Sequence, residues 1–133
     1  MIFLDTSAIY AMADQADPRH EVARTRFGKL IAAGEEILTH NYILVESMAL
    51  LQSRLGLPTA LKLARDAGVF LVEWVDQVTH EEAVRQLARR GSRQASLVDQ
   101  VSFLIMRRRG VQVAMAFDQD FVKAGYRIFE GPA

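Results

Sequence analysis

The amino-acid sequence predicts an α/β fold, a three-layer α/β/α sandwich with a central five-stranded parallel sheet. Two observations predict it. Short β-rich runs alternate with stretches of helical periodicity, and glycines follow those helical stretches, as they do past a helix end. Strands separated by helices pair in parallel through crossovers that are almost always right-handed. With 133 residues, 50% of them hydrophobic, we expect a single domain over residues 1–133.

The five expected strands are short runs rich in β-branched and apolar residues. In a parallel sheet of this kind, ligands bind beyond the carboxyl ends of the strands, where the strand order reverses. The residues that directly follow the strands are therefore the first candidates for a functional site. The expected strands span residues 2–4, 36–39, 69–75, 112–116 and 127–129.

Six helices are expected between and after these strands. Asp17 is an expected N-cap, followed by a proline suited to a first helical turn. Thr79 with Glu82, and Ser96 with Asp99, have the spacing of capping boxes. The expected helices run over residues 17–33, 42–55, 58–67, 79–90, 96–109 and 119–124.

Charge and composition exclude several functions. Lys plus Arg and Asp plus Glu number 16 each, so any site for a polyanion must be a local patch. The absence of cysteine excludes disulfides and thiolate ligands, and it is compatible with a reducing cytosol. No signal peptide pattern is present, and no apolar run approaches the roughly 18 residues of a membrane span. We therefore expect a soluble, cytoplasmic protein with no membrane partner.

Four acidic residues lie where apolar segments end or where packing offers no use for a carboxylate. Asp5 ends the first strand and Asp118 follows the fourth. Asp99 lies in the first turn of an apolar helix. Glu46 is the single charge between positions 42 and 52, and at helical spacing its face is mainly apolar. The sequence predicts that these acids converge at one end of the sheet.

Each acid also has an ordinary structural explanation. Asp5 could cap the following turn, Asp99 could complement a helix dipole and Asp118 could hold a turn. Glu46 could form a salt bridge with an arginine. Together, however, carboxylates about 4 Å apart would repel by roughly 4 kcal/mol per pair at an effective dielectric constant near 20, so they would protonate or bind a cation. Oxygen ligands suit Mg²⁺ or Mn²⁺, which can activate water for attack on a phosphodiester.

Four short motifs, in this order and in a chain of this length, resemble those of PIN-domain ribonucleases, and most closely those of the VapC-type toxins of bacterial VapBC toxin–antitoxin pairs. The resemblance implies a PIN-like five-stranded parallel sheet, Mg²⁺ or Mn²⁺ bound by the four acids, and endonucleolytic cleavage of RNA. It also implies a homodimer and inhibition by a cognate antitoxin protein. The motifs are Leu4-Asp5-Thr6-Ser7, Val45-Glu46, Ser96-Leu97-Val98-Asp99 and Phe117-Asp118-Gln119-Asp120-Phe121.

The resemblance assigns roles residue by residue. Asp5, Asp99 and Asp118 are expected metal ligands, and Glu46 is an expected ligand or water-orienting base. Ala116 departs from the family pattern, which usually has Thr or Ser two positions before the fourth acid to help order the site. Activity could therefore be weakened, or could depend on a neighbouring hydroxyl. The residues expected to assist are Thr6, Ser7, Ser96 and Asp120.

Other polar residues have two interpretations each. Arg89, Arg90 and Arg93 precede Asp99 and could contact RNA phosphates, or they could form a solvated helix end. The three histidines do not have zinc spacing and are expected at the surface or as caps.

Two alternatives to a nuclease remain at this stage. A catalytically silent PIN-like scaffold that binds RNA or protein is kept open by Ala116, although retention of all four acids argues against it. A phosphoacceptor receiver domain would need an acidic pair after the first strand, where Asp5 stands between Leu4 and Thr6.

Overall fold

A five-stranded, wholly parallel sheet forms the centre of the computed structural model, which describes residues 1–90 and 95–130. The strand order is β3-β2-β1-β4-β5, so the order reverses between the central strand β1 and its neighbour β4. Asp5 follows β1, and Asp118 lies shortly after β4. The predicted fold class is therefore confirmed, and its switch point lies between two of the predicted site residues. The strands are β1 (Ile2–Leu4), β2 (Ile37–His40), β3 (Leu71–Glu73), β4 (Val113–Met115) and β5 (Arg127–Ile128).

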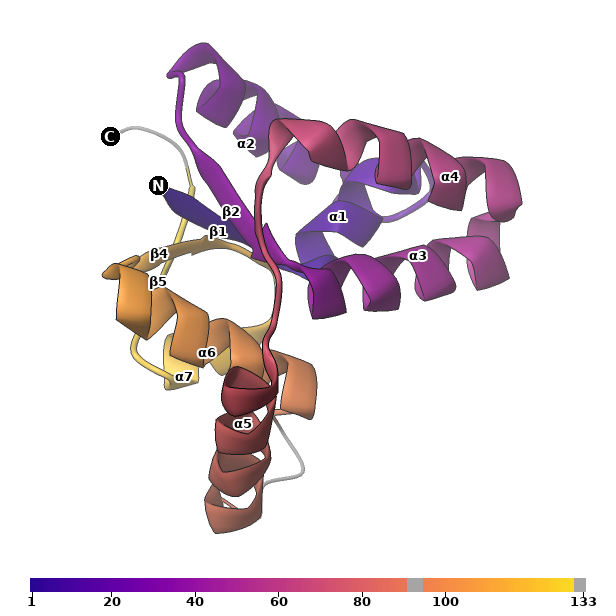
Figure 1. The fold of residues 1–133 in the computed structure, drawn as a ribbon. Coiled ribbons are helices and arrows are strands. Elements are labelled where there is room, and N and C mark those ends of the chain that lie inside the picture. The colour runs from indigo at the N-terminus through magenta and orange to yellow at the C-terminus, as the bar shows by residue number, and fades with distance from the viewer. Residues whose placement is uncertain (91–94, 131–133) are drawn as a thin grey trace.

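The helices form two outer layers (Figure 1). The first four connect β1, β2 and β3 and lie on one side of the strands, whereas the last three connect β3, β4 and β5 and lie on the other side. This division is what right-handed crossovers require of this strand order. A 3-10 turn, η1 (Ala67–Val69), precedes β3. The helices are α1 (Thr6–Ala13), α2 (His20–Ala32), α3 (Asn41–Leu55), α4 (Leu57–Asp66), α5 (Gln77–Arg90), α6 (Leu97–Arg109) and α7 (Gln119–Lys123).

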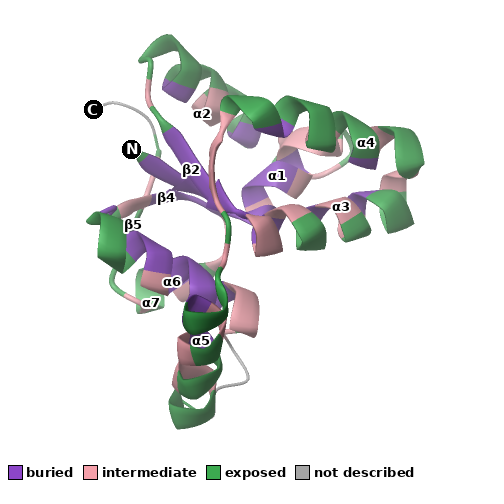
Figure 2. Cartoon of the chain, in the orientation of Figure 1, coloured by how far each residue is buried: buried purple, intermediate pink, exposed green. Residues whose placement is uncertain are grey.

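The hydrophobic core lies between the sheet and these helices (Figure 2). All three residues of β1 are buried, and α6 buries more of its residues than any other described helix. The ring of Phe121 on α7 lies 5.9 Å from Phe3 on β1 and 5.2 Å from Phe103 on α6, measured between ring centroids. These aromatic contacts fix α7 and α6 against the central strand. The acids at the starts of those two helices are thereby held near the end of β1.

Two predicted helix starts were wrong. Asp17 accepts a hydrogen bond from the backbone N–H of Arg19 in a turn before α2, so the helix begins later than its composition suggested. Thr79 lies inside α5, and the backbone N–H of Thr79 donates to Asp76 at 2.8 Å. Thr79 is buried, and its hydroxyl accepts a hydrogen bond from Arg108 of α6 at 2.9 Å. The Thr79–Glu82 capping box is therefore absent.

Other predictions at element ends were confirmed or need correction. The Ser96–Asp99 capping box is present, and Gly110 ends α6 in the left-handed conformation, with φ of 66°. Helix α1 was not predicted from the sequence. The third strand is shorter than predicted, because Val69 lies in the 3-10 turn before β3. In the part of the chain that the structure describes, no helix has the length and apolar character needed to cross a membrane.

Candidate metal centre

Asp5 is fixed by hydrogen bonds that involve both its backbone and its carboxylate. The backbone N–H of Asp5 donates to the carbonyl of Met115 on β4 at 3.1 Å. Its carboxylate caps α1: Oδ2 accepts the backbone N–H of Ser7 at 3.1 Å and the hydroxyl of Ser7 at 2.6 Å. The residue is 4% exposed. The capping role considered for Asp5 is therefore real, and it aims a buried carboxylate at the end of the sheet.

Asp118 is the N-cap of α7, as Asp5 is the N-cap of α1. Its Oδ1 accepts the backbone N–H of Asp120 at 2.9 Å, which makes it the N-cap of that helix. Phe117, the residue before Asp118, contacts the segment that follows β1: its backbone N–H donates to the hydroxyl of Ser7 in the first turn of α1 at 2.9 Å. The Ser7 hydroxyl, which also donates to Asp5, therefore bridges the two strand ends.

Asp99 is held by the capping box of α6. Its Oδ2 accepts the backbone N–H of Ser96 at 3.0 Å, while the hydroxyl of Ser96 accepts the backbone N–H of Asp99 at 3.2 Å. Asp99 is 8% exposed. Ser96, expected to assist the site, thus acts by orienting Asp99.

The aspartates meet at the switch point of the sheet. One carboxylate oxygen from each of Asp99, Asp118 and Asp120 lies within 4.8 Å of the other two. Burial raises the pKa of Asp99 to about 7, and the charges of Asp5, Asp118 and Asp120 add to that increase. Burial also raises the pKa of Asp5, against the opposing effect of its hydrogen bonds from Ser7, and the charge of Asp118 raises it further. These carboxylates are close enough to resist simultaneous ionisation.

A hard divalent cation fits this cluster. The candidate ligands are all carboxylate oxygens, which suit Mg²⁺ or Mn²⁺ and offer nothing to a soft metal. Burial is the main cause of the raised pKa values of Asp5, Asp99 and Asp120, and the charges of neighbouring aspartates raise these pKa values further. Asp120, expected only as an auxiliary residue, lies inside the tight group of three, and Asp5 lies beside it. The arrangement can hold a cation, and the cation would relieve the repulsion.

Glu46 differs from the sequence-based expectation. Its side chain is exposed, as is that of the neighbouring Val45 at 66%, so it does not lie on a buried apolar face. No described residue forms a hydrogen bond or ion pair with its carboxylate. The next residue, Ser47, is buried and donates from its hydroxyl to that of Thr6 at 3.1 Å. Thr6 therefore ties the second turn of α3 to the start of α1, and the Glu46 backbone lies near the Asp5 end of the sheet.

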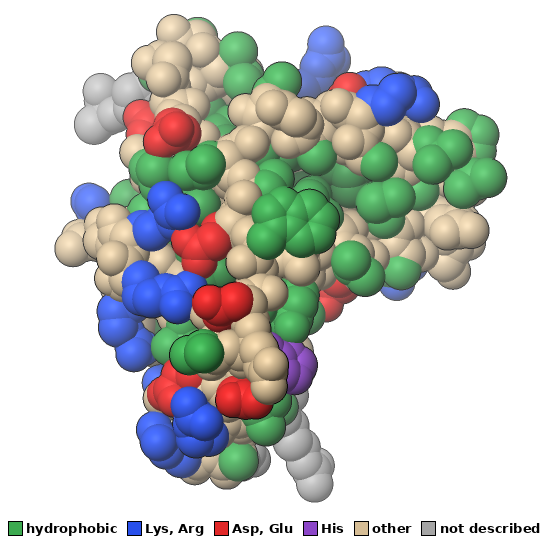
Figure 3. All heavy atoms as spheres, viewed as in Figure 1, with side chains coloured by type: hydrophobic (Ala, Val, Ile, Leu, Met, Phe, Trp, Pro, Cys, Tyr) green, Lys and Arg blue, Asp and Glu red, His purple; other side chains and the backbone are tan. Residues whose placement is uncertain are grey.

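The arginines expected to contact RNA are placed only in part. Arg89 and Arg90 are exposed at the end of α5, and Arg93 lies outside the described residues. Arg108 and Arg109, at the far end of α6, pair with Glu73 at 2.7 and 2.6 Å. Figure 3 shows Lys and Arg side chains interspersed with Asp and Glu over α5 and the end of α6. Positive charge on this face is therefore largely accompanied by negative charge.

Two arginines near the acids were not singled out by sequence reasoning. The guanidinium carbons of Arg19 and Arg26 lie 5.2 and 5.5 Å from the ring centroid of Phe117. Arg19 directly precedes α2 and Arg26 lies seven residues later within it, so the two can reach the same side of the helix. That spacing was the available signal, but it has meaning only once Phe117 is known to face α2.

His40 is the second residue that sequence reasoning undervalued. It caps α3, as expected of one of the histidines, but it is fully buried. Its Nδ1 accepts the backbone N–H of Ile43 at 3.4 Å, and its Nε2 lies 2.8 Å from the hydroxyl of Ser102 on α6. That hydroxyl donates to the carbonyl of Val98, so Nε2 carries the proton. Burial lowers the pKa of His40 to about 3, which keeps the ring neutral.

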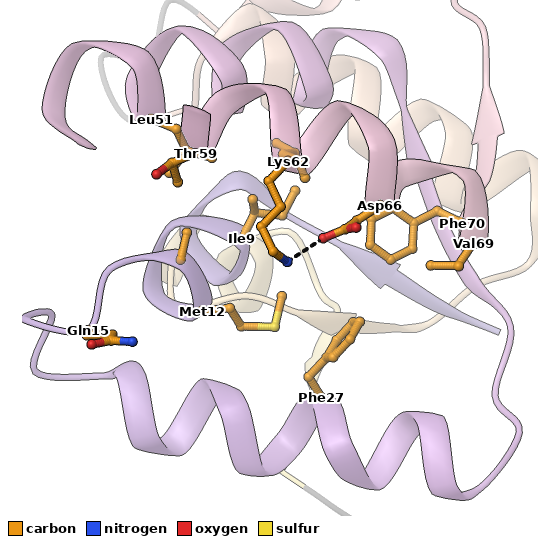
Figure 4. A pocket seen from close by; sticks show the side chains of 12 residues that line it. Ile9, Met12, Gln15, Phe27, Leu51, Thr59, Lys62, Asp66, Val69 and Phe70 are labelled. Atoms are coloured by element: carbon orange, nitrogen blue, oxygen red, sulfur yellow. Dashed lines mark hydrogen bonds and ion pairs between the residues drawn. The ribbon is translucent and has the colours of Figure 1, made fainter. Parts of the chain in front are cut away.

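A separate pocket of about 640 Å³ lies among α1–α4 (Figure 4). Its wall is mainly apolar, with side chains such as Ile9, Met12 and Phe27. Its one acidic residue, Asp66, pairs with Lys62 at 2.8 Å. None of the clustered aspartates lines it, so this pocket is not the metal centre.

Comparison with known proteins agrees with this geometry. The PIN domain family profile matches residues 2–125. The chain is 38% identical over 128 residues to the 23S rRNA-specific endonuclease VapC20 of Mycobacterium tuberculosis, covering 95% of each. The crystal structure of that sarcin-ricin-loop-cleaving toxin superposes with a TM-score of 0.83 at 36% identity, covering 95% of this chain and 96% of that one. A DNA-bound VapBC structure from Salmonella typhimurium has the same fold, with a TM-score of 0.65, 18% identity, and 96% and 97% of the two chains covered.

Proposed function

Because the chain belongs to the PIN-domain family, we propose that it is a metal-dependent endoribonuclease and the toxin of a toxin–antitoxin pair. The observation that carries the proposal is the convergence of Asp99, Asp118 and Asp120 within 4.8 Å beside Asp5, at the switch point of the sheet. The 38% identity to an rRNA endonuclease supports RNA as the substrate class.

The clustered aspartates are proposed to bind Mg²⁺ or Mn²⁺. When bound, such an ion supplies an activated water and stabilises charge on the leaving oxygen. Asp5, Asp99 and Asp118 would bind it, with Asp120 as a further ligand. Asp99 must give up the proton that its raised pKa retains near neutral pH, so binding and deprotonation at Asp99 are coupled.

Glu46 is proposed as the group that orients the attacking water and accepts its proton. A base must lie within hydrogen-bond reach of the proton it removes, directly or through one water. The exposed carboxylate of Glu46 has no described partner to release before it can do so. The Thr6–Ser47 hydrogen bond supports this assignment, because it holds the adjacent backbone near Asp5.

The partners follow from the same assignment. We propose a cognate antitoxin, in line with the toxin–antitoxin assembly seen for the Salmonella protein, and a homodimer as the working form. An RNA substrate implies action in the cytoplasm. An adjacent small reading frame and the mass of the purified protein in solution test the first two proposals.

Cleavage of total cellular RNA tests the proposed activity. Purified, antitoxin-free protein is incubated with Mn²⁺ or with chelator, wild type is compared with Asp99→Asn, and the new RNA ends are mapped. We expect discrete cuts that require metal and disappear in the variant. Absence of cuts from folded wild-type protein, or cuts that the variant retains, would overturn the nuclease assignment.

A silent scaffold is the second candidate, since Ala116 lacks the hydroxyl usual in the family. The position of Ser7 weakens this alternative. Its hydroxyl already binds the Phe117 N–H and Asp5, which orders the same strand end. RNA binding without metal-dependent cleavage would favour the scaffold.

A further inference from the structure

Arg19, Phe117 and Arg26 form a compact group beside the metal centre. The two guanidinium carbons lie 5.2 and 5.5 Å from the centroid of the same ring. Contacts of this length are attractive through the ring quadrupole. The ring therefore holds two otherwise flexible cationic side chains in place.

The position of the ring is itself fixed relative to the aspartates. Phe117 directly precedes Asp118, and its backbone N–H donates to the hydroxyl of Ser7 at 2.9 Å. The same hydroxyl donates to Asp5 at 2.6 Å. Phe117 is thus the sequence neighbour of Asp118, and the Ser7 side chain links its backbone to Asp5.

The two guanidinium groups carry charge that the described residues do not neutralise. None of the ion pairs in residues 1–90 and 95–130 involves Arg19 or Arg26, whereas Arg85, Arg108 and Arg109 each pair with a glutamate. Contact with a ring face leaves the N–H groups of a guanidinium available to acceptors at its edges. Arginine N–H groups match phosphate oxygens in geometry and charge.

We propose that Arg19, Arg26 and Phe117 form a phosphate clamp that binds the RNA backbone next to the scissile bond. The inference rests on the proposed nuclease function and deepens it by assigning a substrate subsite. The net charge of the chain is zero, so electrostatic attraction of RNA needs a local patch. Both arginines contact Phe117, the residue directly before Asp118, and neither forms a described ion pair, which favours them over Arg89 and Arg90 of α5.

RNA binding in the presence of chelator tests the clamp without requiring cleavage. A fluorescently labelled single-stranded RNA of about 20 nucleotides is titrated with full-length wild type, Arg19→Gln/Arg26→Gln and Arg24→Gln at several NaCl concentrations. Arg24 is the matched control, because it is exposed on α2 and lies on a different side from the clamp. We expect roughly tenfold weaker binding for the double variant, with the slope of log affinity against log salt reduced by about 1.4, or about 0.7 per lost contact.

A second variant separates the clamp from a simple change of net charge. Phe117→Leu keeps an apolar side chain but removes the ring, so we expect roughly threefold weaker RNA binding with both arginines still present. Thermal unfolding of every variant is measured alongside. If the double variant unfolds early, Arg19→Gln alone replaces it, because Arg19 is exposed.

The outcomes distinguish failure of the clamp from failure of the nuclease proposal. RNA affinity equal to that of Arg24→Gln, or no RNA binding by wild type, would overturn the clamp even if RNA is cut. Weaker RNA binding by a protein that does not cut RNA would support the clamp and refute the nuclease.

Discussion

The capping aspartates and Glu46 differ in how the chain holds them. Asp5 and Asp118 are the N-caps of α1 and α7, and each accepts a backbone N–H from its helix. Asp99, the third residue of α6, accepts the backbone N–H of the N-cap residue Ser96. Glu46 projects from the second turn of α3, exposed and without a partner among the described residues. The comparison separates a rigid set of acids, which hydrogen bonds hold in place, from one acid that is called the mobile acid here because no described hydrogen bond restrains its carboxylate.

The rigid set leaves specific oxygens for a metal. In the described structure, hydrogen bonds engage Oδ2 of Asp5, Oδ2 of Asp99 and Oδ1 of Asp118. Each carboxylate has a second oxygen that could contact a cation. Capping would therefore orient the proposed ligands before a metal binds, which would lower the conformational cost of binding.

The largest expected effect tests the rigid set. Asp99→Asn should reduce RNA cleavage at least about 1000-fold, since it removes a charged ligand from the metal. The amide oxygen can still accept the Ser96 N–H, so α6 should keep its cap. Initial rates in Mn²⁺ measure the effect, with Asp17→Asn as the matched control. Activity within tenfold of wild type would show that Asp99 is not a required metal ligand.

Although Asp99→Asn should reduce cleavage, it should raise the free energy of unfolding of the metal-free protein. The folded pKa of Asp99, about 7, exceeds its ordinary value of 3.8, so the unfolded chain releases this proton first as pH rises. The stability of the metal-free protein should therefore fall between about pH 4 and 7, by up to about 1.4 kcal/mol per unit from this group. Asp99→Asn should lose that slope and be more stable than wild type at pH 8 by about 1–3 kcal/mol. Denaturant unfolding in chelator measures it.

The next effect tests the mobile acid. Glu46→Gln should lower the cleavage rate roughly 10- to 100-fold, as expected for loss of a general base. The free energy of unfolding should change by less than about 0.5 kcal/mol, because an exposed, unpaired group is altered. Glu81→Gln, an exposed acid on α5, is the control. A large loss of stability would show that the Glu46 carboxylate makes stabilising contacts in the folded protein. Unchanged activity would show that Glu46 is not the base.

The sequence predicted the rigid acids better than the mobile one for a physical reason. Strand ends and helix caps follow from local patterns, so Asp5, Asp99 and Asp118 were found at the positions they hold. The burial of a helix face depends on which neighbours pack against it. α3 buries Ile43, Ser47 and Leu51, so the side bearing Glu46 is exposed despite its apolar neighbours in the sequence.

Contacts between distant residues were the other feature that the sequence did not reveal. The hydroxyl of Thr79 looked like a cap, but it accepts a hydrogen bond from Arg108, 29 residues later. The bridging role of Ser7 depends on β1 and β4 being neighbours. Asp120 joins the tight cluster because Asp118 caps α7 and turns it inward. Such roles become visible only when the strand order is known.

A smaller effect tests how the rigid set is tied together. Ser7→Ala should weaken Mn²⁺ binding roughly tenfold, because it removes the hydroxyl that joins Asp5 to the Phe117 backbone. It should also lower the free energy of unfolding by about 1 kcal/mol. Adding Ala116→Ser should restore part of the Mn²⁺ affinity by placing a hydroxyl directly after β4. Ser53→Ala, exposed on α3, is the control, and calorimetric titration with Mn²⁺ is the measurement. Equal affinities in all variants would show that the bridge is dispensable.

The last effect concerns stability alone and tests His40, which connects the helix of Glu46 to the helix of Asp99. The pKa of His40 is about 3 in the folded protein against an ordinary 6.5, so below pH 6.5 the unfolded chain binds a proton that the folded protein excludes. The stability from neutral His40 is complete above pH 6.5 and falls by up to about 1.4 kcal/mol per unit as pH decreases toward 3.

His40→Gln should therefore be less stable than wild type at pH 7, and the difference should shrink by about 2 kcal/mol by pH 5. The contribution of Asp99 has the opposite slope, but it is present in both proteins and cancels in the difference. Denaturant unfolding in chelator at pH 5, 6 and 7 measures the gap. A gap independent of pH would mean that the pKa of His40 is not lowered in the folded state, so that the folded ring would be protonated at pH 5. The Nδ1 acceptor of α3 would then be lost, and α3 and α6 could not be joined as the structure joins them.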